Sequence, residues 1–122
     1  MKSPYKGKTG IRRLINAFKY SVAGTFAAFK HEDAFRQEVI LTLILIPVAI
    51  YFGETSIDQA LMISSLIFII VVELLNSAVE ATVDRISVKR HKLAKRAKDI
   101  GSAAVFFSLI NAATIWFLIL VK

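Results

Sequence analysis

The chain has 122 residues, of which 56% are hydrophobic and 20% are charged, and its mean hydropathy is +0.60. This hydropathy excludes an ordinary soluble domain, because long uncharged runs in so short a chain are typical of a few membrane spans with little aqueous bulk. The lack of cysteine excludes a disulfide-stabilised scaffold. The net charge of +7 suits either nucleic acid or an anionic membrane surface, so the placement of the charges decides between them.

Residues 9–30 are predicted to form a surface helix. Apolar side chains recur there with the i, i+3, i+4, i+7 spacing of one helical face, namely Ile11, Leu14, Ile15, Phe18, Val22, Phe26 and Phe29. Basic and polar residues lie off this stripe, an arrangement typical of a helix in the membrane interface. The same pattern allows a helix packed on protein, and spacing alone does not separate the two.

Three later segments, at about residues 34–52, 59–83 and 97–121, are predicted to be transmembrane helices. The clearest uncharged run is residues 100–121, which as a helix would be roughly 33 Å long and would cross a bilayer. Pro47 lies inside the first span and is expected to kink it. The fold class predicted from the sequence is therefore an all-α membrane protein with a single membrane domain, residues 1–122.

The basic residues predict the orientation of these spans. Eight lie between residues 2 and 36, none between 51 and 59, seven between 85 and 98, and the last is Lys122. The positive-inside rule then puts the N-terminal region and the second connection in the cytoplasm, and the first connection and the C-terminus outside. Because topology accounts for the basic excess, nucleic acid is not an expected partner.

The second span carries polar groups that need a partner or a purpose inside a membrane. On a helix, Glu73, Asn76, Glu80 and Asp84 lie at about 0°, 300°, 340° and 20°, so they form one narrow stripe. Three ionised carboxylates so close together favour a bound cation. Glu73 lies roughly 22 Å beyond Asp58 along the helix, which puts the stripe at the cytoplasmic boundary.

Other polar residues near the span ends are expected in the same cytoplasmic layer: Glu32, Arg36, Glu38, Lys98 and Asp99. Such a layer could bind a divalent metal through carboxylates and nucleotide phosphates through Lys and Arg. The simpler alternative is that these residues only join or cap helices. A small ion-coupled transporter with Glu73 as proton relay is the rival from another class, although residues 59–72 offer only Ser64 and Ser65 as a polar path toward the outer face.

The segment ELLNSAVEATVDR at residues 73–85 resembles the signature of the small bacterial integral-membrane diacylglycerol kinases. In the same order, AFRQE at 34–38, RAKDIGSAA at 96–104 and Tyr20-Ser21 with Gly24 resemble that family, so the likeness runs from about Arg13 to the C-terminus. The related undecaprenol kinases share much of the pattern. Asn76-Ser77-Ala78 and the GSAA continuation at 101–104 favour the diacylglycerol branch, with undecaprenol kinase as the alternative.

The resemblance implies a homotrimer of three-span subunits in the bacterial inner membrane. Its reaction would transfer the γ-phosphoryl group of MgATP to the primary hydroxyl of diacylglycerol, giving phosphatidic acid and ADP. It further implies that Glu73 is the general base and that Glu32 and Glu80 hold Mg²⁺ with the nucleotide. Further residues implied to contact ATP are Arg13, Tyr20, His91, Lys98 and Asp99. Residues implied to contact the lipid are Arg13, Phe35, Gln37, Glu73, Asn76, Ser102 and Trp116. Lys89 and Arg90 are more basic than the family pattern.

Overall fold

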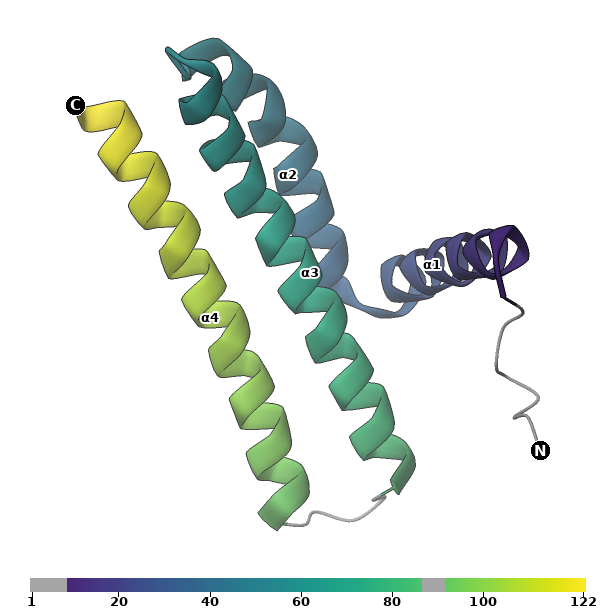
Figure 1. The fold of residues 1–122 in the computed structure, drawn as a ribbon. Helices are drawn as coiled ribbons and strands as arrows, with labels where there is room; N and C mark the ends of the chain where they lie inside the picture. The colour runs from purple at the N-terminus through teal and green to yellow at the C-terminus, as the bar shows by residue number, and fades with distance from the viewer. Residues whose placement is uncertain (1–8, 87–91) are drawn as a thin grey trace.

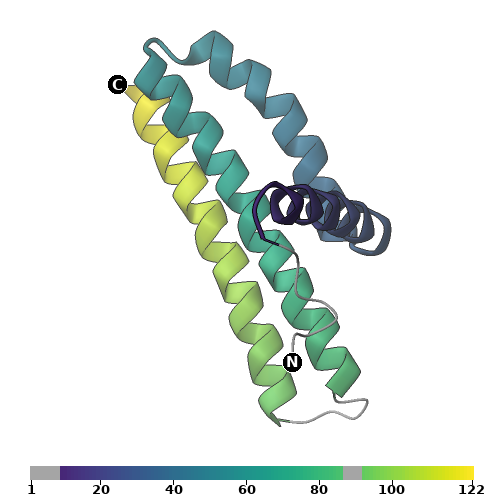
Figure 2. The ribbon, with the colours of Figure 1, turned by 45° about the vertical axis from the view of Figure 1, so that its right-hand side comes forward.

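A computed structural model describes residues 9–86 and 92–122, and this part of the chain contains four helices and no strand. The helices are α1 (Ile11–His31), α2 (Asp33–Phe52), α3 (Ser56–Ile86) and α4 (Lys92–Val121). In Figure 1, α2, α3 and α4 run side by side and α1 projects sideways from the base of α2. In the turned view of Figure 2, α1 crosses in front of the lower end of α2.

The prediction of three membrane-spanning helices is confirmed by length and composition, because α2, α3 and α4 are each long and apolar enough to cross a bilayer. With 31 residues, α3 is about 46 Å long, longer than a hydrocarbon core of about 30 Å. Its polar end therefore extends past the hydrocarbon. Pro47 lies inside α2, and the helix continues through it to Phe52.

The central helix of the bundle is α3, which packs against α2, α4 and α1. Most of the buried side chains belong to it: Asp58, Met62, Ser65, Leu66, Ile69, Glu73 and Asn76. On α2 the buried side chains are Phe35 and Ala49, and on α4 they are Ser108 and Ala112. Most of the large apolar side chains of α2 and α4 are instead exposed, as expected of surfaces that face lipid or another protein chain.

The ends of α3 and α4 farthest from α1 are joined by polar contacts. Lys122 Nζ pairs with Asp58 Oδ2 at 2.8 Å. About two turns further in, the indole N–H of Trp116 donates to Ser65 Oγ at 3.1 Å and to the carbonyl of Met62 at 3.3 Å. These bonds fix the register of α4 along α3 and the rotation of α4 about its own axis at this end.

A tight turn connects α2 to α3. The side-chain amide of Gln59 donates to the carbonyls of Ile50 (3.0 Å) and Gly53 (3.3 Å), and Thr55 Oγ1 accepts from the backbone N–H of Asp58 at 3.0 Å. A Cβ at Gly53 would stand 2.8 Å from the Ala49 carbonyl, so this turn needs glycine.

Candidate active site

Glu73 lies on α3 and is 4% exposed, which makes it a buried carboxylate within a helix that is long enough to span a membrane. The charges of Glu38 on α2, of Glu80 about two turns further along α3 and of Glu32 at the joint of α1 and α2 all act on it. Three other carboxylates, on α2, on α3 and at the joint of α1 and α2, are therefore near enough for their charges to act on Glu73. Like charges in a poorly solvated place repel, so the arrangement favours a cation or a shared proton.

Asn76 is 9% exposed and lies one turn along α3 from Glu73. Its Nδ2 donates to Glu80 Oε1 at 3.3 Å, while its Oδ1 has no hydrogen-bond partner within the described residues. That oxygen faces Gly101 of α4, where a Cβ would overlap it. Gly101 thus lets α4 approach the Asn76 amide closely, and the amide in turn orients Glu80.

The polar end of α3 is tied to α4 by an ion pair. Lys98 Nζ lies 2.7 Å from Asp84 Oδ1, and the charge of Glu80 also acts on Lys98. On the next residue of α4, the Asp99 carboxylate accepts from Lys95 Nζ at 2.7 Å. Lys98 therefore faces the acidic stripe of α3, whereas Asp99 is paired along its own helix.

A hollow of about 480 Å³ lies between α1 and α3. Polar side chains on its wall are Ser21, Thr25, His31, Glu32 and Ser77. The rest of the wall is small or apolar, with Gly24, Ala27, Ala28, Leu74, Ala78 and Ala81. Because small residues line both sides, a ligand headgroup can come close to the backbone of both helices, next to the Glu32 carboxylate.

The carboxylates around Glu73 suit magnesium in their chemistry. Within residues 9–86 and 92–122, no three acidic or histidine side chains are close enough to form a complete metal cage. Magnesium rarely uses such a cage, since it keeps water ligands and is commonly held by one or two carboxylates together with substrate phosphates. Glu32 and Glu80, whose charges both act on Glu73, match that need.

The remaining residues predicted to contact ligands lie in several places. Arg13 and Tyr20 are exposed on α1, Gln37 is exposed on α2, and Ser102 is exposed on α4. Phe35 is 1% exposed and belongs to the packed core at the start of α2. Trp116 is held against α3, at the end of α4 opposite the acidic stripe. His91, together with Lys89 and Arg90, lies outside the described residues.

Two contributors to this site had no individual role in the sequence-based prediction. Glu38 was expected only as one member of the cytoplasmic polar layer, and its interaction with Glu73 depends on how α2 is turned toward α3. Gly101 appeared only in the GSAA motif at 101–104 that resembles the family, and the small residues of that motif were a signal for its close contact with Asn76.

The fold and the site define a class of protein, namely a multi-pass helical membrane protein with one buried glutamate and further acidic side chains near one end of its spans. The family model for prokaryotic diacylglycerol kinase matches residues 19–120. The chain is 52% identical to a diacylglycerol kinase of Pseudomonas aeruginosa over 97% of its own length and 96% of that protein. It is 53% identical to one of Haemophilus influenzae (88% and 92%) and 45% identical to one of Escherichia coli K12 (92% and 92%).

The chain therefore belongs to the prokaryotic diacylglycerol kinase family. The sequence-based prediction of this family, and of a membrane lipid kinase within it, is confirmed. The transporter alternative has no support from these relatives.

Proposed function

We propose that the chain transfers the γ-phosphoryl group of MgATP to the primary hydroxyl of diacylglycerol, yielding phosphatidic acid and ADP. The observation that carries this proposal is the buried carboxylate of Glu73, surrounded by the charges of Glu38, Glu80 and Glu32. Phosphoryl transfer depends mainly on positioning and on neutralising charge, so a small helical bundle with a few carboxylates and lysines suffices.

Glu73 is the proposed general base. It accepts the proton of the lipid hydroxyl while that oxygen forms a bond to the γ-phosphorus and the bond from the γ-phosphorus to the bridging oxygen of ADP breaks. Its place supports this role, because a carboxylate buried on a spanning helix is within reach of a lipid hydroxyl.

Glu32 and Glu80 are the proposed ligands of Mg²⁺, which when bound neutralises the phosphates of ATP. The Nδ2 of Asn76 holds one oxygen of Glu80 and leaves the other free to bind. Lys98 is the proposed phosphate contact, and its ion pair with Asp84 and the charge of Glu80 acting on it support this role. Arg13, Tyr20, Asp99 and His91 are further proposed contacts to the nucleotide.

The lipid is proposed to enter from the bilayer beside α1. The hollow between α1 and α3 accommodates a glycerol headgroup, with Glu32 at its wall and Glu73 on the neighbouring face of α3. Phe35, Gln37, Asn76, Ser102 and Trp116 are also proposed to contact this substrate.

We also propose that the chain works as a homotrimer in the inner membrane. The N-terminus and the acidic cluster would be cytoplasmic and the C-terminus outside, as the distribution of basic residues predicts. Exposed apolar side chains along α4, such as Phe106, Phe107 and Phe117, offer surface both for lipid and for neighbouring subunits.

The test is transfer of radiolabel from γ-labelled ATP to diacylglycerol in mixed micelles, with undecaprenol as the competing acceptor. Glu73→Gln should abolish turnover and leave assembly and MgATP affinity intact, because it removes the base but keeps the shape. Glu80→Gln should weaken binding of the metal nucleotide. Full activity of Glu73→Gln would remove this residue from the role of base, and preferential labelling of undecaprenol would change the substrate.

A further inference from the structure

The joint between α1 and α2 consists of one residue. Glu32 separates His31 from Asp33 and has an extended backbone with φ −119° and ψ 111°. Its N–H donates to the Ala28 carbonyl at 2.9 Å, and its carbonyl accepts from the Arg36 N–H at 3.2 Å, so its backbone completes both helices. Any change in the angle between α1 and α2 must therefore pass through Glu32 and move its side chain.

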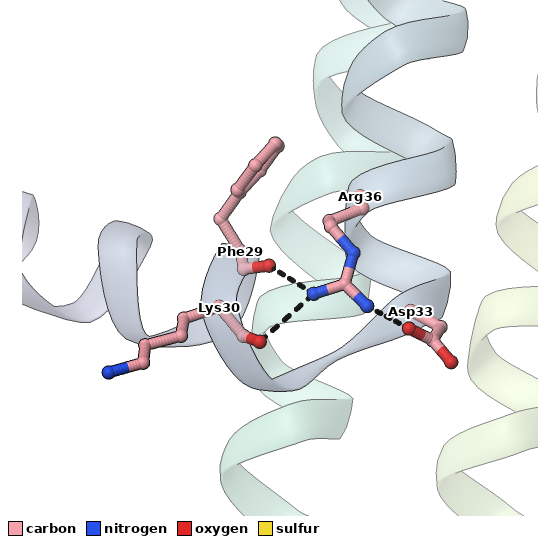
Figure 3. Close-up of polar contacts among 4 residues, drawn as sticks. All are labelled: Phe29, Lys30, Asp33 and Arg36. Atoms are coloured by element: carbon pink, nitrogen blue, oxygen red, sulfur yellow. Dashed lines mark hydrogen bonds and ion pairs between the residues drawn. The ribbon is translucent and has the colours of Figure 1, made fainter.

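Arg36 bridges this joint, as Figure 3 shows. Its Nη1 donates to the carbonyls of Phe29 at 2.7 Å and Lys30 at 2.9 Å in the last turn of α1, and its Nη2 pairs with Asp33. Carbonyls in the last turn of a helix have no partner within the helix, and a guanidinium at that end also suits the helix dipole. The planar guanidinium of Arg36, whose two nitrogens form a fork, therefore holds α1 at one angle to α2.

No other side-chain hydrogen bond joins α1 to a second helix within the part of the chain that the structure describes. The packing of α1 is also sparse, with Ala28 as its single buried residue. The angle of α1 thus depends on Arg36 more than on a hydrophobic core. A segment held by so few contacts should move when one of them is lost.

Glu32 connects this joint to the candidate active site. It lines the hollow between α1 and α3, and its charge acts on Glu73. Arg36 reaches neither of these places in the described contacts, since its guanidinium is occupied by α1 and Asp33. Its influence on the site therefore passes through the position of Glu32.

We propose that Arg36 is a positioning residue for the metal-nucleotide site: by clamping the last turn of α1 to the start of α2, it fixes the position of the Glu32 carboxylate at the hollow between α1 and α3. This inference rests on the proposed role of Glu32 as a magnesium ligand. Asp33 supports the clamp by holding the second nitrogen of the Arg36 fork.

The first experiment is a magnesium titration of phosphotransfer at saturating ATP and diacylglycerol. Arg36→Gln should raise the magnesium midpoint by about tenfold, the scale on which groups behind a metal ligand act. Arg36→Lys keeps the charge and one donor group but not the fork, so its midpoint should lie between those of Arg36→Gln and the wild type. Arg12→Gln, which removes the same charge from exposed α1, is the matched control and should match the wild type. An unchanged midpoint in Arg36→Gln would overturn the proposal.

A double-mutant cycle separates positioning from general stabilisation. If Arg36 acts through Glu32, then Arg36→Gln should have no further effect on the magnesium midpoint once Glu32→Gln is present. Equal effects in both backgrounds would show that Arg36 acts by another route. If Arg36→Gln does not fold, the same cycle with Arg36→Lys still tests whether Arg36 acts through Glu32.

The position of α1 relative to α3 can be measured without an activity assay. Because the chain has no cysteine, spin labels can be attached at Lys19→Cys on α1 and Thr82→Cys on α3, diluted with unlabelled chain to isolate single pairs. Arg36→Gln should broaden the label-to-label distance distribution, and Arg12→Gln should leave it narrow. A narrow distribution in Arg36→Gln would refute the clamp. If instead the clamp is seen but Glu32→Gln leaves the magnesium dependence unchanged, the assignment of Glu32 as metal ligand is what fails.

Discussion

Replacing Gly101 by alanine tests the contact between α3 and α4 at the centre of the proposed site. The added Cβ would overlap Asn76 Oδ1, an atom at the end of a side chain rather than in the backbone. The simplest relief is rotation of the Asn76 amide. That rotation would break its bond from Nδ2 to Glu80, which is already long at 3.3 Å.

The two energy terms of Gly101→Ala are comparable, so their difference is small. Alanine in place of glycine inside a helix gains about 1 kcal/mol. Loss of a hydrogen bond to a charged group costs about 1.5–3 kcal/mol, and the length of this bond favours the lower end of that range. Gly101→Ala should therefore be less stable than the wild type by about 0.5 kcal/mol. Turnover should fall by about tenfold, because Glu80 loses its orienting partner.

Repeating the Gly101→Ala substitution in the Asn76→Ala variant tests this reasoning. With Asn76→Ala already present, the added Cβ has no amide to displace, so Gly101→Ala should now stabilise the chain by about 1 kcal/mol. The coupling between the two sites should be about 1.5 kcal/mol, measured as the difference between the effects of Gly101→Ala on the free energy of unfolding by SDS in mixed micelles in the two backgrounds. Additive effects of the two substitutions would refute the reasoning, as would a Gly101→Ala protein of unchanged turnover.

Two further predictions concern the opposite end of the bundle. Trp116→Phe removes the indole donor to Ser65 Oγ and the Met62 carbonyl, so the free energy of unfolding in mixed micelles should fall by about 1 kcal/mol; no loss of stability would show that the two bonds do not hold the helix ends together. The hydrogen bond to Asp58 raises the pKa of Lys122 above its ordinary value of 10.5. A folded-state pKa above the unfolded value means that this stabilisation is complete below the ordinary value and is lost as the pH rises through the folded value. Wild type should therefore be more stable than Asp58→Asn at pH 8, with the difference disappearing only in strongly alkaline solution, and a difference that vanishes near pH 8 would contradict this account.

The sequence by itself determined the number and kind of helices. Three apolar stretches of bilayer length predicted α2, α3 and α4, since backbone polar groups inside a hydrocarbon layer must be satisfied within a helix. The helix ends were less well determined. The last helix was expected from about residue 97 and begins at Lys92, because helical hydrogen bonding continues into the polar flank where hydropathy gives no signal.

Part of the site was also readable from the sequence. The 3.6-residue period put Glu73, Asn76 and Glu80 on one stripe, and in the structure Asn76 and Glu80 are bonded to each other and Glu73 is buried. Periodicity describes one helix at a time, however, so it could not give the partner of that stripe.

Only the tertiary structure decided those partners. The rotation of α2 brings Glu38 toward Glu73, the approach of α4 sets Gly101 against Asn76, and the angle of α1 depends on the fork of Arg36. Each of these depends on how side chains from distant parts of the chain fit together, and that fit is set by contacts between helices rather than by the pattern along any one of them.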